Sequence, residues 1–149
     1  MRKLMAAALL LGCLGSACGE SPPAAPTPTP ITLTGTWIGS VTVLGTTAQM
    51  RWTLTQNGAS VTGPATLGLS TGTVLLNGFL TGTLTGTTLT YTISIGPGGV
   101  PAQPACTGQI GGTMTAAIGA TSTLAGSANV TSSTCTAPFP GGNITLTRQ

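Results

Sequence analysis

Residues 74–95 have the sequence VLLNGFLTGTLTGTTLTYTISI, and this stretch decides the fold class. Apolar or small residues alternate with Thr and Ser on both sides of a short turn at 85–87. A period of two is typical of strands with one buried face, and β-branched Thr suits strands. The stretch therefore predicts two antiparallel strands joined by a tight turn, with Leu80, Leu89 and Tyr91 facing inward.

The same alternation extends in both directions, from Ile31 to Gln149, and no segment shows a helical period. Asn57-Gly58 is a strong signal for another tight hairpin. We expect eight strands in all. Their inward-facing residues, besides those above, include Leu33, Trp37, Val41, Met50, Trp52, Leu54, Val61, Ala65, Val74, Leu76, Ile93, Ile95, Ile110, Met114, Leu124, Ala128, Val130, Ile144 and Leu146.

The links between the expected strands alternate between short and long. Three are two or three residues, whereas the links at 44–47, 68–72, 96–104 and 132–142 are longer. In an up-and-down meander, alternate links lie at opposite ends. The sequence therefore predicts an all-β, eight-stranded antiparallel up-and-down barrel with one tight end and one end of long loops; a β-sandwich is the alternative.

Five expected strands carry a weak repeat of an apolar or small residue, then Thr or Ala, then Gly. Glycine inside a strand marks a bend or a close approach of another backbone, and a closing barrel needs such bends. The inward Gly and Ala residues would also leave room inside a barrel. The repeat glycines are Gly35, Gly63, Gly82, Gly108 and Gly126.

Two local motifs resemble those of the calycin barrels, the superfamily of lipocalins and avidins. The residues Leu33-Thr34-Gly35-Thr36-Trp37 resemble the Gly-x-Trp motif of its first strand, and Asn143–Arg148 resembles its last strand. The resemblance implies a calycin-like barrel in which Arg148 packs on Trp37 and closes the tight end. The avidin biotin-binding residues are not recognisable here, so biotin is not implied.

The composition argues against several classes of function. Only 3% of residues are charged, against about 25% in typical domains, and there is no His. Acid–base catalysis and metal sites need groups that the chain barely has, since Glu20 is its single carboxylate side chain. Few positive charges are present to bind phosphates. We expect no enzyme activity, no metal, no cofactor and no nucleic-acid partner.

The N-terminus has the layout of an export signal. Arg2 and Lys3 precede an apolar run at 4–11, which is far shorter than the roughly 20 residues of a spanning helix. Residues 10–21, LLGCLGSACGES, resemble the bacterial lipoprotein signal, in which a Cys becomes the acylated N-terminus. We favour Cys18, with Cys13 as the alternative, because Cys18 gives a signal of normal length and a flexible tether follows it.

The chain then divides into three parts. Residues 1–17 form the expected signal peptide, 18–30 the lipidated Cys and a Pro-rich tether, and 31–149 the barrel domain. Pro-rich linkers are extended, at about 3.1 Å per residue. The expected location is the bacterial cell envelope, anchored in a membrane through the lipid. In some bacteria, lipoproteins of the kind that this signal resembles are retained in the inner membrane by an Asp after the acylated Cys; this chain has Gly19 there, so we favour the outer membrane of a two-membrane cell.

Cleavage before Cys18 leaves one pair of cysteines, Cys106 and Cys135. The two residues are equidistant from the turn near Gly119-Ala120, so they would face each other across a long hairpin. Export favours oxidation, and closing a segment of this length is worth roughly 3–4 kcal/mol in the chain-entropy model. We expect a structural disulfide at the end with the long loops.

Two functions remain. In the first, the barrel binds a small, uncharged, apolar ligand, which enters between apolar mouth residues Leu69, Val100 and Phe139. In the alternative, the barrel is filled by side chains, and the protein is a structural or interaction lipoprotein that acts through its Thr-rich outer face or its loops.

Overall fold

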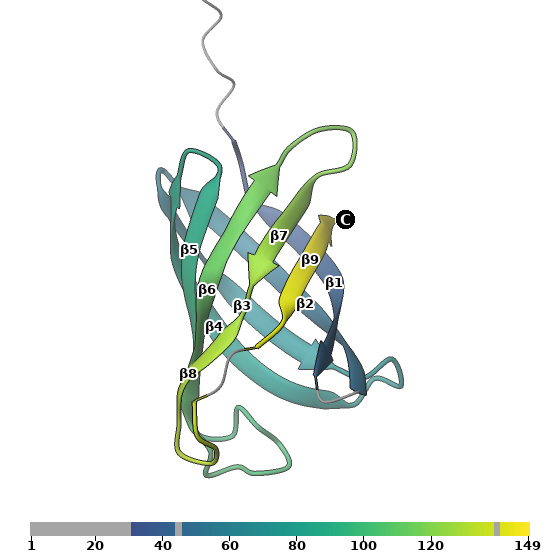
Figure 1. The fold of residues 1–149 in the computed structure, drawn as a ribbon, viewed down its shortest axis with the longest axis vertical. Helices are drawn as coiled ribbons and strands as arrows, with labels where there is room; N and C mark the ends of the chain where they lie inside the picture. The colour runs from purple at the N-terminus through teal and green to yellow at the C-terminus, as the bar shows by residue number, and fades with distance from the viewer. Residues whose placement is uncertain (1–30, 44–45, 139–140) are drawn as a thin grey trace, which may run out of the picture.

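The computed structural model describes residues 31–43, 46–138 and 141–149, and their regular secondary structure is entirely β (Figure 1). The strands are β1 (Gly35–Val43), β2 (Thr46–Asn57), β3 (Ser60–Gly68), β4 (Val74–Thr85), β5 (Thr88–Ile95), β6 (Gly108–Ala117), β7 (Thr123–Ser127), β8 (Asn129–Ser133) and β9 (Asn143–Arg148).

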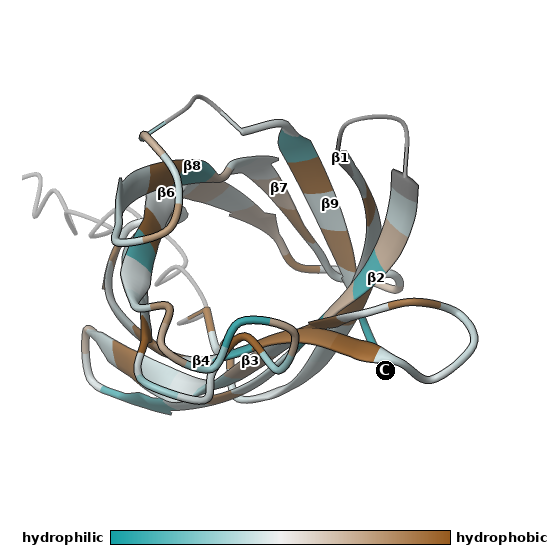
Figure 2. Ribbon diagram, turned by 90° about the horizontal axis from the view of Figure 1, so that it is seen from below, coloured by the Kyte–Doolittle hydropathy of each residue, from teal (hydrophilic) through white to brown (hydrophobic). Residues whose placement is uncertain are grey.

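Eight of these strands form a closed antiparallel barrel. Strands β1 to β6 pair in chain order, β7 pairs with β6, and β9 lies between β7 and β1. Figure 2, viewed along the barrel, shows the ring that results. The predicted eight-stranded up-and-down barrel is confirmed, and the β-sandwich alternative is wrong because a single sheet closes on itself.

The predicted seventh strand is interrupted at Ala128. Before this residue, β7 lies between β6 and β9. After it, β8 continues along β6, in the same register as far as Val130, and has no pairing with β9. The amide of Ala128 donates to the carbonyl of Gly142 at 3.1 Å, just before β9 begins. The chain is split because β9 covers only its first half, so β8 lies outside the barrel.

The core is built from one face of each strand, as the alternation predicts. Trp37, Trp52, Leu80, Leu124 and Leu146 are fully buried. The other buried apolar residues are Leu33, Val41, Ala48, Met50, Leu54, Val61, Ala65, Leu89, Tyr91, Ile93, Ile95, Cys106, Met114, Ala116, Ala128 and Ile144.

The inward position predicted for Val74 is wrong, since this side chain is 40% exposed. Leu67 pairs with Leu76, but the next residue, Gly68, pairs with Val74. Leu75 is thus an extra residue on β4. Such a bulge reverses the alternation beyond it and turns Val74 outward.

Glycines in the barrel wall mark close approaches between strands rather than empty space. A Cβ atom at Gly63 would overlap the carbonyl oxygen of Thr53, and one at Gly126 would overlap that of Thr113. A Cβ atom at Gly82 would lie 2.7 Å from the carbonyl oxygen of Thr90, and one at Gly108 would lie 2.6 Å from that of Ser132, both closer than real Cβ contacts. The room expected from the small residues is therefore occupied by main chain at these positions.

The two ends of the barrel differ. We call the end with the links 58–59, 86–87 and 118–122 the turn end, and the opposite end, with 69–73, 96–107 and 134–138, the loop end. Residue 31 and the C-terminus lie at the turn end (Figure 1). The Gln56 side chain holds the incoming chain there, because it accepts from the amide of Leu33 at 2.7 Å and donates to the carbonyl of Ile31 at 3.1 Å.

Among the residues described, no helix has the length and apolar character needed to cross a membrane.

Candidate functional site

A small apolar pocket lies at the loop end, and we call it the loop-end pocket. Its volume is about 190 Å³. Four elements and one loop contribute its apolar wall: β4, the end of β5, the 96–107 loop, β6 and β8. The corresponding residues are Leu76, Ile95, Val100, Ile110 and Val130. Ile95 is buried and the other four are half-buried, so part of this apolar wall faces the solvent.

The 96–107 loop is folded by its own backbone hydrogen bonds. Gly98 donates to the carbonyl of Pro104 at 2.7 Å, and Asn77 of β4 donates to the carbonyl of Gly99 at 2.7 Å. The carbonyl of Val100 accepts from Gln103 at 2.9 Å. These bonds fix the position of Val100 at the pocket, so this part of the wall is formed before any ligand arrives.

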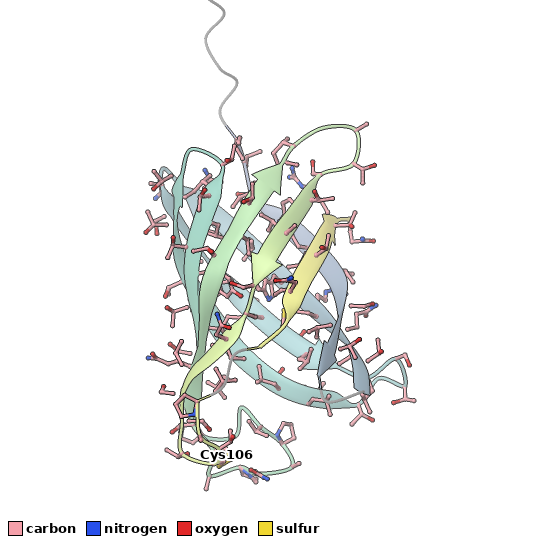
Figure 3. The ribbon with its side chains drawn as sticks, in the orientation of Figure 1. Cys106 is labelled. Carbon is pink, nitrogen blue, oxygen red and sulfur yellow. A yellow bond between two sulfur atoms is a disulfide. The ribbon has the colours of Figure 1, made fainter. Side chains whose placement is uncertain are left out.

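Cys106 and Cys135 also line the pocket. Their sulfur atoms lie at disulfide-bonding distance, and their Cα atoms are 5.6 Å apart. Figure 3 places Cys106 at the loop end, beside the long loops. The amide of Thr134 donates to the carbonyl of Thr107 at 2.9 Å, which extends the β6–β8 pairing down to the cysteines.

A bulge brings the two cysteines opposite each other. Ile110 pairs with Val130, but the preceding residue, Gln109, pairs with Ser132. Thr131 is therefore an extra residue on β8. Without this shift Cys106 would face Thr134 instead of Cys135, so the bulge sets the register that the cysteine pair requires.

The other predicted pair lies at the turn end, away from the pocket. Trp37 of β1 is directly opposite Arg148 of β9, and the guanidinium carbon lies 6.0 Å from the centroid of the indole ring. Arg148 also donates to the carbonyl of Thr34. The buried indole N–H of Trp37 donates to the carbonyl of Leu33 at 2.8 Å. These contacts hold the ends of the chain together.

The core holds an aromatic pair, and the sequence predicts only that both of its residues face inward. The rings of Trp52 and Tyr91 meet edge to face, with centroids 4.9 Å apart. The hydroxyl of Tyr91 donates to the carbonyl of Ser127 at 3.0 Å, and burial raises the pKa of this phenol. The buried indole N–H of Trp52 has no acceptor among the residues described.

The predicted mouth residues have different positions. Val100 lines the loop-end pocket. Leu69 is half-buried in the β3–β4 loop, packs against the core and does not line this pocket. Phe139 lies outside the described residues, as do Cys13, Cys18 and the tether. Ile110 and Val130 also line the pocket, although the sequence predicts only that they face inward. Their position close to the expected long loops could have identified them as mouth residues.

The surroundings of the pocket are electrically neutral. In the described part of the chain the charged side chains are Arg51, exposed on β2, and Arg148 at the turn end. No cluster of three His, Cys, Asp or Glu residues is present within 31–43, 46–138 and 141–149.

The fold and the site define a small closed β-barrel with an uncharged apolar pocket at one end. No family model, no curated protein sequence and no solved structure matches the chain.

Proposed function

We propose that this protein is an exported, lipid-anchored binding protein with a calycin-like barrel, without catalytic activity, that holds a small uncharged apolar group at its loop end. The loop-end pocket is the observation that carries this proposal. Part of its apolar wall comes from three barrel strands, β4, β5 and β6. The rest comes from the 96–107 loop and from β8, and the Cys106–Cys135 pair joins that loop to the chain just after β8.

The size of the pocket limits its occupant. Pockets for drug-sized ligands are typically about 300–1,000 Å³, whereas this one is about 190 Å³. A single ring or a short alkyl chain is therefore the appropriate size. Burial of apolar surface would provide the affinity, at roughly 25 cal/mol per Å², and the neutral wall would disfavour a charged group.

The position of the pocket supports a role facing away from a membrane. The proposed anchor, Cys18 or alternatively Cys13, precedes the barrel through a Pro-rich tether. The barrel begins at the turn end, where Gln56 holds residues 31–33. The pocket is at the opposite end, so an anchored protein could present it to the aqueous side of the bacterial envelope. The outer membrane is the proposed site of anchoring.

A second candidate is a structural or interaction lipoprotein with a filled barrel. The close approaches at Gly63 and Gly126 and the central aromatic pair favour this candidate. Its working surface would be the outer face, where Thr62, Thr81 and Thr92 form one row of paired hydroxyl side chains across three strands. The two candidates differ in whether the loop-end pocket is ever occupied.

Native mass spectrometry of the protein, and of the protein mixed with benzene or cyclohexane, tests the proposal. We expect a stoichiometric adduct that is lost on denaturation. Ile110→Phe places a ring in the pocket and should abolish the adduct. Ile118→Phe is the matched control, because Ile118 is 44% exposed at the turn end. A clean mass under every condition, or an adduct that survives Ile110→Phe, would favour the filled structural barrel.

A further inference from the structure

Within the part of the chain that the structure describes, strand β8 is paired on one side only. It occupies one end of the strand order and pairs with β6, whereas β7 above it pairs on both sides, with β6 and with β9. Among the described residues, the two hydrogen bonds between β8 and the returning chain are at the start of β8. They are the Ala128–Gly142 bond and a bond from the amide of Gly141 to Oδ1 of Asn129, at 3.1 Å.

The chain that returns from β8 is unsuited to pair with the rest of it. Residues 136–142 have the sequence TAPFPGG. Pro138 and Pro140 lack the N–H group that a strand ladder needs, so this segment cannot supply a continuous set of backbone donors. The main-chain groups of Val130–Ser133 on the side away from β6 therefore have no regular intramolecular partner among the described residues.

The edge also lacks most of the protection that exposed strands carry. Charged residues and prolines usually block the addition of another strand, but β8 has the sequence NVTSS. Its bulge at Thr131 and its length of five residues are the protections present. A short and neutral extended segment could therefore pair with it.

The loop-end pocket lies beside this edge. Val130, Ser132 and Ser133 line the pocket, together with Ile110 of β6. At about 190 Å³ the pocket is smaller than a site for a drug-sized ligand and suits one apolar side chain. An unpaired edge next to a pocket is the arrangement used in strand addition, where backbone bonds give affinity and pockets for alternate side chains give specificity.

We propose that β8 and the loop-end pocket together bind an extended, uncharged peptide segment of a partner protein. The segment adds as a strand along Val130–Ser133 and places one apolar side chain in the pocket. This inference rests on the pocket of the proposed function and identifies its occupant as a side chain of a peptide rather than a free small molecule.

The probe is the neutral peptide acetyl-TSTLTST-amide, added to the ¹⁵N-labelled full-length protein. We expect amide shift changes and slower hydrogen exchange at Val130, Ser132 and Ser133, and unchanged signals at the turn end. Replacing the central Leu of the peptide by Ala should weaken binding about 10- to 100-fold, because the burial of one side chain is lost. In the Ile110→Phe variant the Leu and Ala peptides should bind equally weakly, while Ile118→Phe should behave as wild type.

Backbone pairing is tested with two N-methylated versions of the peptide. Methyl groups on one set of alternate amides point toward β8 and should abolish binding, whereas methyl groups on the other set should have little effect. Equal binding by both versions would contradict strand addition. Adducts with benzene in the absence of any peptide effect at β8 would leave the proposed function intact and overturn this inference. Concentration-dependent protection of β8 without peptide would also overturn it, by showing that a second copy of the chain pairs there.

Discussion

Arg148 lies directly opposite Trp37 across the β9–β1 ladder, with its guanidinium carbon 6.0 Å from the indole centroid, and donates to the carbonyl of Thr34. The end of the chain thus covers the start of the barrel. The planar guanidinium can lie near the ring and still reach a carbonyl, which the compact ammonium of Lys cannot do in the same way.

Arg148→Ala should therefore lower the free energy of unfolding by about 2–4 kcal/mol, the sum of a cation–π contact and a charged hydrogen bond. Arg148→Lys should recover part of this loss. Urea unfolding followed by Trp fluorescence provides the measurement. Arg51→Ala is the control, because Arg51 is exposed and its removal should change stability by no more than about 0.5 kcal/mol. Equal effects of the two Ala variants would contradict a closing role for Arg148.

The two buried tryptophans should respond differently to the same substitution. Trp37→Phe leaves the carbonyl of Leu33 without its 2.8 Å donor, whereas Trp52→Phe removes an N–H that has no acceptor among the described residues. Both changes remove similar volume from the core. We expect Trp37→Phe to be more destabilising by about 1–3 kcal/mol, the cost of an unsatisfied buried group. Denaturation curves by far-UV circular dichroism test this, and a larger loss for Trp52→Phe would reveal an unrecognised partner of its indole.

Loss of the Cys106–Cys135 bond should destabilise the barrel and disrupt the loop-end pocket. The two residues are separated by 29 positions, and closing a loop of that length is worth roughly 3–4 kcal/mol in the chain-entropy model. The double variant Cys106→Ala, Cys135→Ala should therefore have a lower urea midpoint, by the amount that corresponds to this loss of free energy. A reducing agent should shift the wild type to the same midpoint and leave the double variant unchanged. If the reducing agent does not change the urea midpoint of the wild type, the two cysteines are not bonded to each other.

Tyr91 should make the protein unstable at high pH. Burial raises the pKa of its phenol above the ordinary value of about 10, so the folded state retains a proton that the unfolded state releases. Its contribution to stability is fully present below about pH 10 and is lost as the pH rises toward the folded pKa, by about 1.4 kcal/mol per pH unit.

Tyr91 is the single tyrosine in the sequence, so tyrosinate absorbance reports on it directly. We expect its ionisation to coincide with unfolding. The Tyr91→Phe variant should lose the steep alkaline decline, although it also leaves the carbonyl of Ser127 without its donor. Ionisation near pH 10 in a protein that stays folded would contradict the burial of this group.

The alternation of apolar residues with Thr made most of the fold predictable. Leu80, Leu89 and Leu124 point inward because their strands have one face toward the core, and that property can be recognised within a few residues. The near symmetry of one hairpin predicted that Cys106 and Cys135 come close, but the bulge at Thr131, which sets their register, was not predictable from it. The inward position of Val74 was not, because the bulge at Leu75 arises from pairing with another strand.

The candidate site was only partly predictable. Val100 was expected at the mouth, and Ile110 and Val130 were expected to face inward. That these three side chains meet in one pocket depends on the folding of the 96–107 loop and on the path of β8. Neither follows from local alternation. The loop depends on turn hydrogen bonds such as that between Gly98 and Pro104 and on the bond from Asn77 of β4, and the path of β8 depends on its pairing with β6.

By itself the sequence determined an all-β chain of low charge whose strands have one apolar face, because a period of two requires only the local geometry of the backbone. The tertiary structure decided that β8 leaves the barrel and that the loop-end pocket opens beside its edge. Those features depend on which strand lies next to which. Strand β9 pairs with the segment up to Ser127, and the part after Ala128 has a strand partner on one side only among the residues described.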